Sequence, residues 1–316
     1  MIVGYFGKLP KAGDFLRGGV AGEPASGFER WIEQGMVYGS TRRSDWQQAF
    51  DGGALHGFIY RAPPSIGAVS VLVGVIRPSR DTVGRRFPLV VFSQVPEPVL
   101  AGAPHIAPLM LGDFFELASE ILLDAHGMST DDFRAAVSGI PAPRIDQLTS
   151  YVAEYDEWVS ATPLATPLSV TYGEPEGAAA PHAIDTLIQC VAPFIGQEPM
   201  STPLSARLPL GAGGVASAAF WIDVARRVAR WRRTVPSAFW SASEEDGTLL
   251  LQLGATPHSS LAELWAPDPD SDHVCDLTRA PRISRESILG RLPPAVGHAL
   301  SAPEHPVGYF LQSLSG

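Results

Sequence analysis

The sequence has 316 residues, of which 45% are hydrophobic and 18% charged, so the chain can bury a large core and is not globally disordered. Its formal net charge of −10 argues against nucleic acid as the main partner, because phosphate backbones attract basic surfaces. The two cysteines, Cys190 and Cys275, are too few for a disulfide scaffold and fit a reducing compartment. We therefore expect a cytoplasmic protein.

Predicted strands and helices are interspersed in the first 127 residues. Strand patterns cover residues 2–6, 55–60, 69–76 and 89–95. Apolar residues at helical spacing cover 28–37 and 113–125, and Gly127 stands where the second helix would be C-capped. The strands at 69–76 and 89–95 are apolar on both faces, which predicts a sheet covered on both sides. Residues 69–76 are also the longest apolar stretch, and they are too few to cross a bilayer, so we expect no membrane insertion.

The rest of the chain is predicted to contain more helix than strand. Helices are expected at 146–159, 183–191, 217–233 and 284–292, and strands at 168–172 and 248–253. Residues 163–181, rich in Pro, Gly, Ala and Thr, are predicted to form a flexible connection around the strand at 168–172. These elements indicate an α/β fold: a layered α-β-α sandwich with a mixed β-sheet. We expect residues 1–316 to form a single domain, with 182–316 packed on the same core.

Several familiar chemical motifs are absent or incomplete in the sequence. Residues 211–216 fit a loose dinucleotide-binding glycine pattern, but no βαβ unit with a ribose-binding acid accompanies them. The acidic run at 268–272 begins like a calcium loop, yet His273 and Arg279 occupy positions that need Gly and Glu. The histidines lack metal-ligand spacing, and there is no nucleophile elbow. We therefore predict no metal and no cofactor; these motifs reveal no catalytic site, although they do not exclude an enzyme.

Five arginines cluster near the end of the helix predicted at 217–233. They are Arg226, Arg227, Arg230, Arg232 and Arg233. Cations are favourable at a helix C-terminus, which accounts for the cluster without a ligand. The alternatives are a nucleic-acid footprint or contact with an acidic protein, for which Arg226, Arg230 and Arg233 are the weaker interaction candidates.

Two segments are more specific than a generic core. The first is GYFGKLPKAGDFLR at residues 4–17, which holds Lys8 and Lys11, the only lysines among 23 basic residues. The second is GVIRPSRDTVGRRFPL at residues 74–89. Glycine and proline punctuate both segments, and Ser79 and Asp81 are turn formers, so each is predicted to leave a strand through an ordered loop.

Together these segments resemble the TagF (ImpM) family of accessory proteins of bacterial type VI secretion systems. That family opens with a GKLPxxGDF segment and later carries PSxDxxGRxFPL after an apolar strand. The resemblance makes residues 1–140 the most characteristic part of the chain. One departure is Thr82, where the family often has Arg; this chain has Arg80 instead.

The resemblance implies a non-enzymatic cytoplasmic protein that represses assembly of the secretion system after translation. The partner that the resemblance implies is the forkhead-associated scaffold protein Fha. The resemblance predicts no particular oligomeric state. The candidate residues lie in the two loops at 7–17 and 77–88: Lys8, Lys11, Asp14, Arg17, Arg77, Ser79, Asp81 and Arg85.

These residues allow two interpretations. In one, Lys8, Asp14, Asp81 and Arg85 form an internal salt-bridge network that braces the two loops. In the other, the loops form a recognition surface or a ligand notch. The alternative function is accordingly a small-ligand-binding or enzymatic domain that uses a notch between the 7–17 and 77–88 loops.

Overall fold

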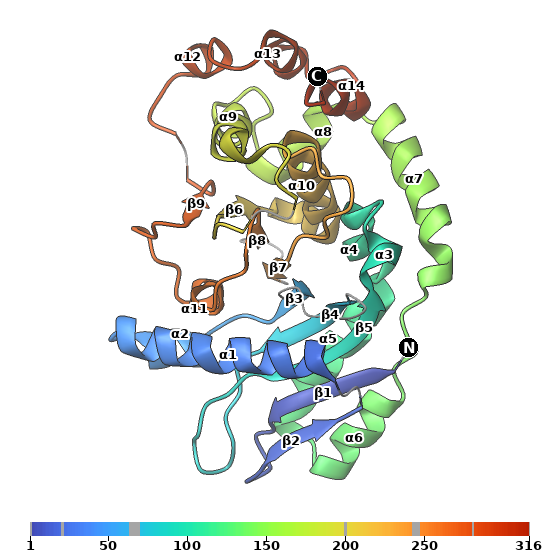
Figure 1. Cartoon of the computed structure of the whole chain (residues 1–316), viewed down its shortest axis with the longest axis vertical. Coiled ribbons are helices and arrows are strands. Elements are labelled where there is room, and N and C mark those ends of the chain that lie inside the picture. Colours follow the sequence, from blue (N-terminus) through green and yellow to red (C-terminus); the bar gives the residue numbers. More distant parts are fainter. Residues whose placement is uncertain are drawn as a thin grey trace.

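A mixed β-sheet runs through the computed structural model, which describes residues 2–19, 22–62, 70–198, 201–241, 247–279 and 281–315 (Figure 1). Over these residues the sheet has nine strands in the order β2-β1-β5-β4-β3-β7-β8-β6-β9. Neighbouring strands are antiparallel except β6 and β9, which are parallel. The strands are β1 (Val3–Lys8), β2 (Phe15–Gly18), β3 (His56–Arg61), β4 (Ser70–Arg77), β5 (Leu89–Pro96), β6 (Ser205–Pro209), β7 (Ala238–Ser241), β8 (Thr248–Gln252) and β9 (Val274–Asp276).

Side chains of the central strands alternate between two hydrophobic cores, one on each face of the sheet. On β3, Phe58 and Tyr60 enter one core while Ile59 enters the other. On β4, Leu72 and Ile76 share the core of Phe58, and the valines between them face the opposite side. The predicted coverage of both faces is therefore confirmed, and so is the α-β-α layering.

The two helical layers come from different parts of the chain. Helices α1 and α11 pack together on the face that buries Phe58, and α5 packs on β4 and β5. Phe28 of α1 is fully buried, with its ring centroid 4.4 Å from that of Tyr60. The helices are α1 (Glu23–Arg42), α2 (Trp46–Asp51), α3 (Glu97–Leu100), α4 (Ala107–Met110), α5 (Gly112–Asp124), α6 (Thr130–Ser138), α7 (Leu148–Ala161), α8 (Ala165–Tyr172), α9 (Ala179–Val191), α10 (Gly214–Val228), α11 (Ser259–Trp265), α12 (Arg285–Leu289), α13 (Pro294–Ser301) and α14 (Val307–Ser313).

The strands predicted in the N-terminal half agree with the structure, although Val69 of the 69–76 prediction lies outside the described residues. None of the described helices combines the length and the apolar character that crossing a membrane requires.

The strand predicted at residues 168–172 is wrong, because this segment belongs to helix α8. The run contains Val170 and Thr171, whose β-branched side chains favour strands. Its buried residues, however, include Leu168 and Thr171, which are spaced three apart as on one face of a helix. Gly173 then ends the helix with φ +76°, a conformation that glycine adopts without strain. Packing has overridden local propensity here.

The helix predicted at 217–233 is also too long at its C-terminal end. Helix α10 ends at Val228, and Arg230 has a left-handed φ of +55°. Arg230, Arg232 and Arg233 therefore follow the helix and are not part of its last two turns.

Close strand packing makes Gly74 in β4 a sensitive position. A Cβ there would lie 2.2 Å from the Val91 carbonyl oxygen of β5, an impossible contact unless the sheet shifts. We expect Gly74→Ala to lower the free energy of unfolding by about 2 kcal/mol or more. Gly102→Ala is the matched control, since no atom lies within 4 Å of the added Cβ. Urea denaturation of both variants measures the difference, and equal stabilities would contradict this packing.

Candidate functional site

The carboxylate of Asp81 is the centre of a hydrogen-bonded cluster between the two motif loops. Its side chain has 0% exposure. Oδ2 accepts from Lys8 Nζ at 2.6 Å and from Arg85 Nε at 2.7 Å. Oδ1 accepts the backbone N–H groups of Val83 at 3.1 Å and Arg85 at 2.9 Å. We call Lys8, Asp81 and Arg85 the loop brace.

A tight turn gives Asp81 these partners. The backbone N–H of Gly84 donates to the Asp81 carbonyl at 3.0 Å, and the N–H of Asp81 donates to the Arg85 carbonyl at 3.1 Å. Gly84 has φ +85°, which other residues adopt only with strain. The glycine of the GR pair in the second motif is thus required by the turn that surrounds the carboxylate.

Further contacts join the second motif to the first. Ser79 Oγ donates to the Lys8 carbonyl at 2.7 Å, and the Thr82 N–H donates to the Ala12 carbonyl at 3.1 Å. The Arg85 guanidinium also donates to the Gly13 carbonyl. The two motifs, some 70 residues apart in sequence, therefore form one ordered unit.

The loop brace strongly favours the ionised form of Asp81. Burial alone would raise the pKa of this carboxyl, but the hydrogen bonds from Lys8 and from the N–H and guanidinium of Arg85 hold the pKa well below its usual range. A carboxylate held charged in this way is a poor proton carrier near neutral pH. Its chemistry suits anchoring a loop.

Asp14 does not belong to the loop brace, so that part of the predicted network is wrong. The residue is exposed and forms no ion pair or hydrogen bond with any residue that the structure describes. It lies in the connection between β1 and β2, beyond Gly13, whose carbonyl receives Arg85. The backbone at Gly13, rather than the carboxylate that follows it, supplies the contact.

The remaining loop candidates attach the unit to its surroundings. Lys11 Nζ donates to the Gly127 carbonyl at 2.7 Å. Arg17 lies 2.5 Å from Glu29 Oε1 of α1. Arg77 donates to the carbonyls of Leu122 at 2.9 Å and Leu123 at 3.2 Å, so it caps the C-terminal end of α5. These contacts involve backbone carbonyls and one exposed ion pair.

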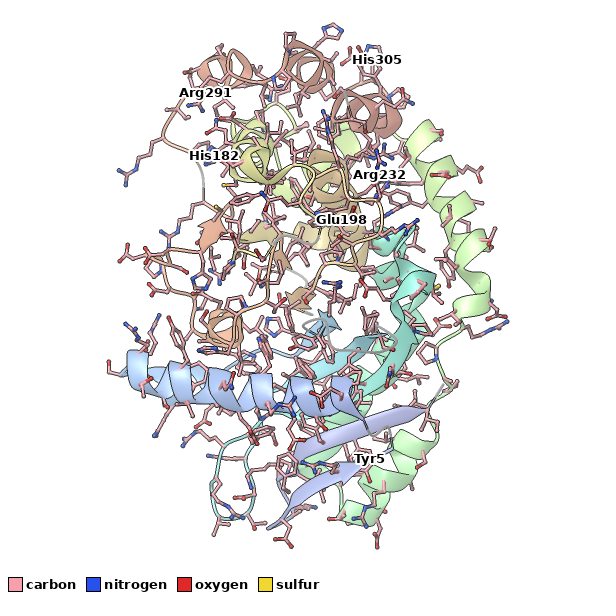
Figure 2. All side chains as sticks on the ribbon, viewed as in Figure 1. Tyr5, His182, Glu198, Arg232, Arg291 and His305 are labelled. Atoms are coloured by element: carbon pink, nitrogen blue, oxygen red, sulfur yellow. The ribbon has the colours of Figure 1, made fainter. Side chains whose placement is uncertain are left out.

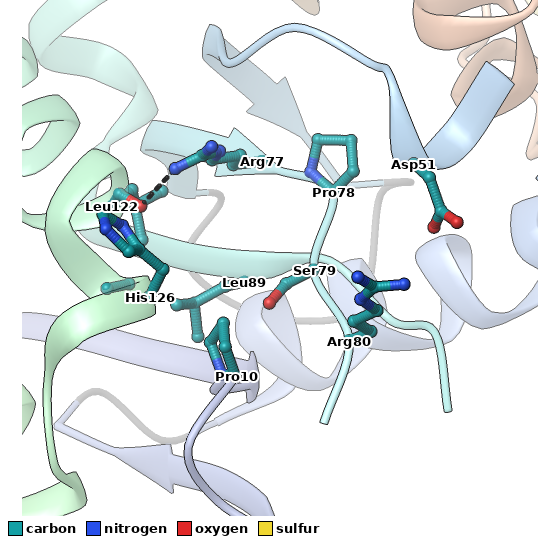
Figure 3. Close-up of a pocket in the computed structure, with 10 residues that line it drawn as sticks. Pro10, Asp51, Arg77, Pro78, Ser79, Arg80, Leu89, Leu122 and His126 are labelled. Carbon is teal, nitrogen blue, oxygen red and sulfur yellow. Dashed lines mark hydrogen bonds between the residues drawn. The ribbon is translucent and has the colours of Figure 1, made fainter. Parts of the chain in front are cut away.

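A cavity of about 340 Å³ lies beside this unit, between the strand ends and the C-terminus of α5 (Figure 3). Its polar lining includes Asp51, Arg77, Ser79, Arg80 and His126. The cavity borders both motif loops, through Pro10 and residues 77–80, but its lining does not include Lys8, Asp14, Asp81 or Arg85, which the predicted notch requires. Figure 3 shows Arg77 reaching toward Leu122, and Arg86 pairs with Asp51 at 2.6 Å.

Of the two arginines that line the cavity, Arg80 forms fewer contacts than Arg77. Its exposed guanidinium forms no ion pair or hydrogen bond within the described ranges, and it attracts Asp51 only at longer range. Neither here nor in the rest of the described chain do three His, Cys, Asp or Glu side chains gather where they could bind a metal.

The arginines at the end of α10 surround a buried acid that the sequence analysis missed. Asp223 has 0% side-chain exposure and accepts from Arg226 at 2.7 Å and from Arg227 at 3.2 Å. Tyr155 Oη lies 3.5 Å from it, and burial lowers the pKa of the nearby His105 to about 4. The sequence feature that could have revealed this cluster is an acidic residue on the apolar stripe of α10, placed three and four residues before two arginines.

The arginines beyond α10 lie in a turn that binds a second carboxylate. Glu198 Oε1 accepts the backbone N–H groups of Arg232 at 2.9 Å, Arg233 at 2.5 Å and Thr234 at 2.7 Å. Glu198 and Arg232 lie close together in Figure 2. At Arg232 and Arg233 it is the backbone, rather than the guanidinium, that makes this contact.

The pH dependence of stability is a test of the loop brace. Because folding lowers the pKa of Asp81 below its ordinary value of 3.8, the carboxylate stabilises the fold above that pH and loses this effect as the pH falls further. We expect Asp81→Asn to lower the melting temperature at pH 7, and the gap from wild type to narrow below about pH 4. Asp14→Asn is the control and should follow wild type throughout. Thermal melts from pH 7 to 2 measure this; a gap that stays constant would contradict it.

Comparison with known proteins agrees with the sequence motifs. Residues 4–140 match the family model described as TagF N-terminal domain, Type VI secretion system-associated. No curated protein is matched by the chain. The fold is similar to the crystal structure of PA0076 from Pseudomonas aeruginosa PAO1, with a TM-score of 0.50, 20% identity, and coverage of 85% of this chain and 96% of that chain. The loop brace lies wholly within the matched residues, and residues 4–140 are a TagF N-terminal domain, the part of the chain that this type VI secretion-associated family model covers.

Proposed function

We propose that this protein is a non-enzymatic, cytoplasmic repressor that acts after translation on type VI secretion assembly by binding the scaffold protein Fha. The TagF N-terminal domain supports the link to type VI secretion. The ionic groups of the loop brace support a binding role over a catalytic one, because Lys8, Asp81 and Arg85 already satisfy one another.

The observation that carries this proposal is the outward side of the braced turn. Val83, whose N–H is held by Asp81, is 73% exposed at the tip. The Arg85 side chain is 60% exposed beside it. An apolar side chain next to a cation on a pre-ordered loop is a suitable anchor for a protein partner, since little ordering entropy is lost on binding. The brace and the recognition surface are then two sides of the same turn.

Substitution at the tip tests this surface. We expect Val83→Ser to weaken binding to the Fha protein of the same secretion cluster by roughly tenfold while the fold is retained, because an exposed side chain contributes little to folding. Val37→Ser on α1 is the matched control, since Val37 is 63% exposed and lies outside both loops. Calorimetry with the purified proteins measures both affinities.

The same variants test repression in cells. A strain without the gene should show more type VI secretion than its parent. Wild-type protein should restore repression in that strain, and the Val83→Ser variant should not. Equal binding by wild type and Val83→Ser would exclude the tip as the interface. Absence of wild-type binding at micromolar protein and low salt would argue against direct sequestration of Fha.

The second candidate function, binding of a small ligand, is favoured by the cavity beside Arg77 and Arg80. These two cations suit a small carboxylate or phosphate. If such a ligand binds, inorganic phosphate or citrate at millimolar concentration should raise the melting temperature of wild type but not of Arg80→Ala. Equal shifts in both proteins would indicate a general salt effect and exclude this site.

A further inference from the structure

The two cysteines of the chain meet in the fold. Cys190 lies near the end of α9, and Cys275 is the middle residue of β9, 85 positions later. Their Sγ atoms are 3.3 Å apart. They are the only cysteines among 316 residues, and in reducing compartments paired thiols of this kind are usually transient or redox-sensing rather than structural.

The surrounding structure holds the thiols together and leaves them accessible. Leu187 and Val191 are buried on either side of Cys190, which fixes this turn of α9 against the core. Cys275 packs on the same core and pairs with Ala206 of β6, at the edge of the sheet. Both cysteines are half-buried, so a small reagent can reach them. A disulfide bond of about 2.05 Å requires the sulfurs to approach by only roughly 1.3 Å.

We propose that Cys190 and Cys275 form a reversible intramolecular disulfide when the protein meets a low-molecular-weight disulfide such as oxidised glutathione. The Cys190 thiolate attacks one glutathione sulfur, a mixed disulfide forms, and one glutathione thiolate leaves. Cys275 gives its proton to solvent, and its thiolate attacks the Cys190 sulfur and displaces the second glutathione. Two protein thiols lose two electrons, and one glutathione disulfide is reduced to two thiols.

Electrostatics supports this order of attack. The hydrogen bond from Cys275 lowers the pKa of Cys190 to about 7, so much of it is thiolate near neutral pH. The same contact, together with burial, raises the pKa of Cys275. These shifts favour Cys190 as the first thiol to attack, whereas the contact itself allows either sulfur to donate the hydrogen bond.

The disulfide would fasten the edge of the sheet to the helical layer. β9 has three residues and pairs only with β6 in the described part of the chain. A covalent link to α9 removes the freedom of this strand to separate, and it also closes a long loop in the unfolded chain. The oxidised protein should melt at a higher temperature and exchange the amide hydrogens of β9 more slowly.

The test is incubation of the full-length native protein with oxidised glutathione at pH 7.5, followed by intact-mass measurement and peptide mapping. Wild type should lose two hydrogens, about 2 Da, with Cys190 linked to Cys275, and dithiothreitol should restore the original mass. Cys190→Ser and Cys275→Ser keep one thiol each and should accumulate a glutathione adduct instead. Only wild type should gain thermal stability on oxidation.

Other outcomes would overturn the proposal. Wild type that accumulates two glutathione adducts, forms only interchain dimers, or keeps both thiols free would show that the sulfurs do not meet in solution. A wild-type protein in guanidinium chloride is the control for the role of the fold, because the unfolded chain should favour adducts over the internal bond.

Discussion

Burying a charged carboxylate without partners costs more free energy than the rest of the fold can offset. This constraint organises the N-terminal half of the molecule. Asp81 meets it with Lys8 from the end of β1 and with the N–H groups and guanidinium of its own turn. Each partner requires a local conformation: β1 must pass close to the second motif, and Gly84 must adopt a positive φ. At Gly7 an added Cβ would lie 2.0 Å from the Pro88 carbonyl oxygen, which shows how close that approach is. Both motifs thus supply partners to one buried charge.

The same arrangement explains how a structural network can serve recognition. The inner side of the 79–87 turn is occupied by hydrogen bonds within the turn and by hydrogen bonds to the first loop, so the turn is ordered before a partner binds. Its outer side carries Val83, which no core contact requires to be apolar. The interpretation as a brace and the interpretation as a surface are therefore compatible, because they concern opposite sides of the turn.

The C-terminal half uses the same physical solution on a helix. Asp223 is buried in α10 and neutralised by Arg226 and Arg227 one turn later. Strands β7, β8, β6 and β9 extend the sheet of the N-terminal half, and α10 packs in the larger of the two cores. The Cys190–Cys275 contact lies at the far edge of this extension, opposite the edge formed by β2. The proposed binding surface and the proposed redox site are thus at different ends of one sheet.

Local sequence determined the elements with strong periodicity: the strands around residues 55–60 and 89–95, the helix at 28–37, and the two-sided burial of the sheet. It also determined which loops carry the characteristic residues, because glycine and proline spacing encodes turns directly. Tertiary structure alone decided that residues 168–172 are helical, that Asp14 stays outside the loop brace, and that the cavity is lined by Arg80 instead of Lys8. It also brought together two cysteines 85 residues apart. The physical reason is the difference between local and long-range interactions. Periodicity in a segment shows which of its faces is buried, whereas the atoms that this face contacts depend on packing against segments distant in the chain.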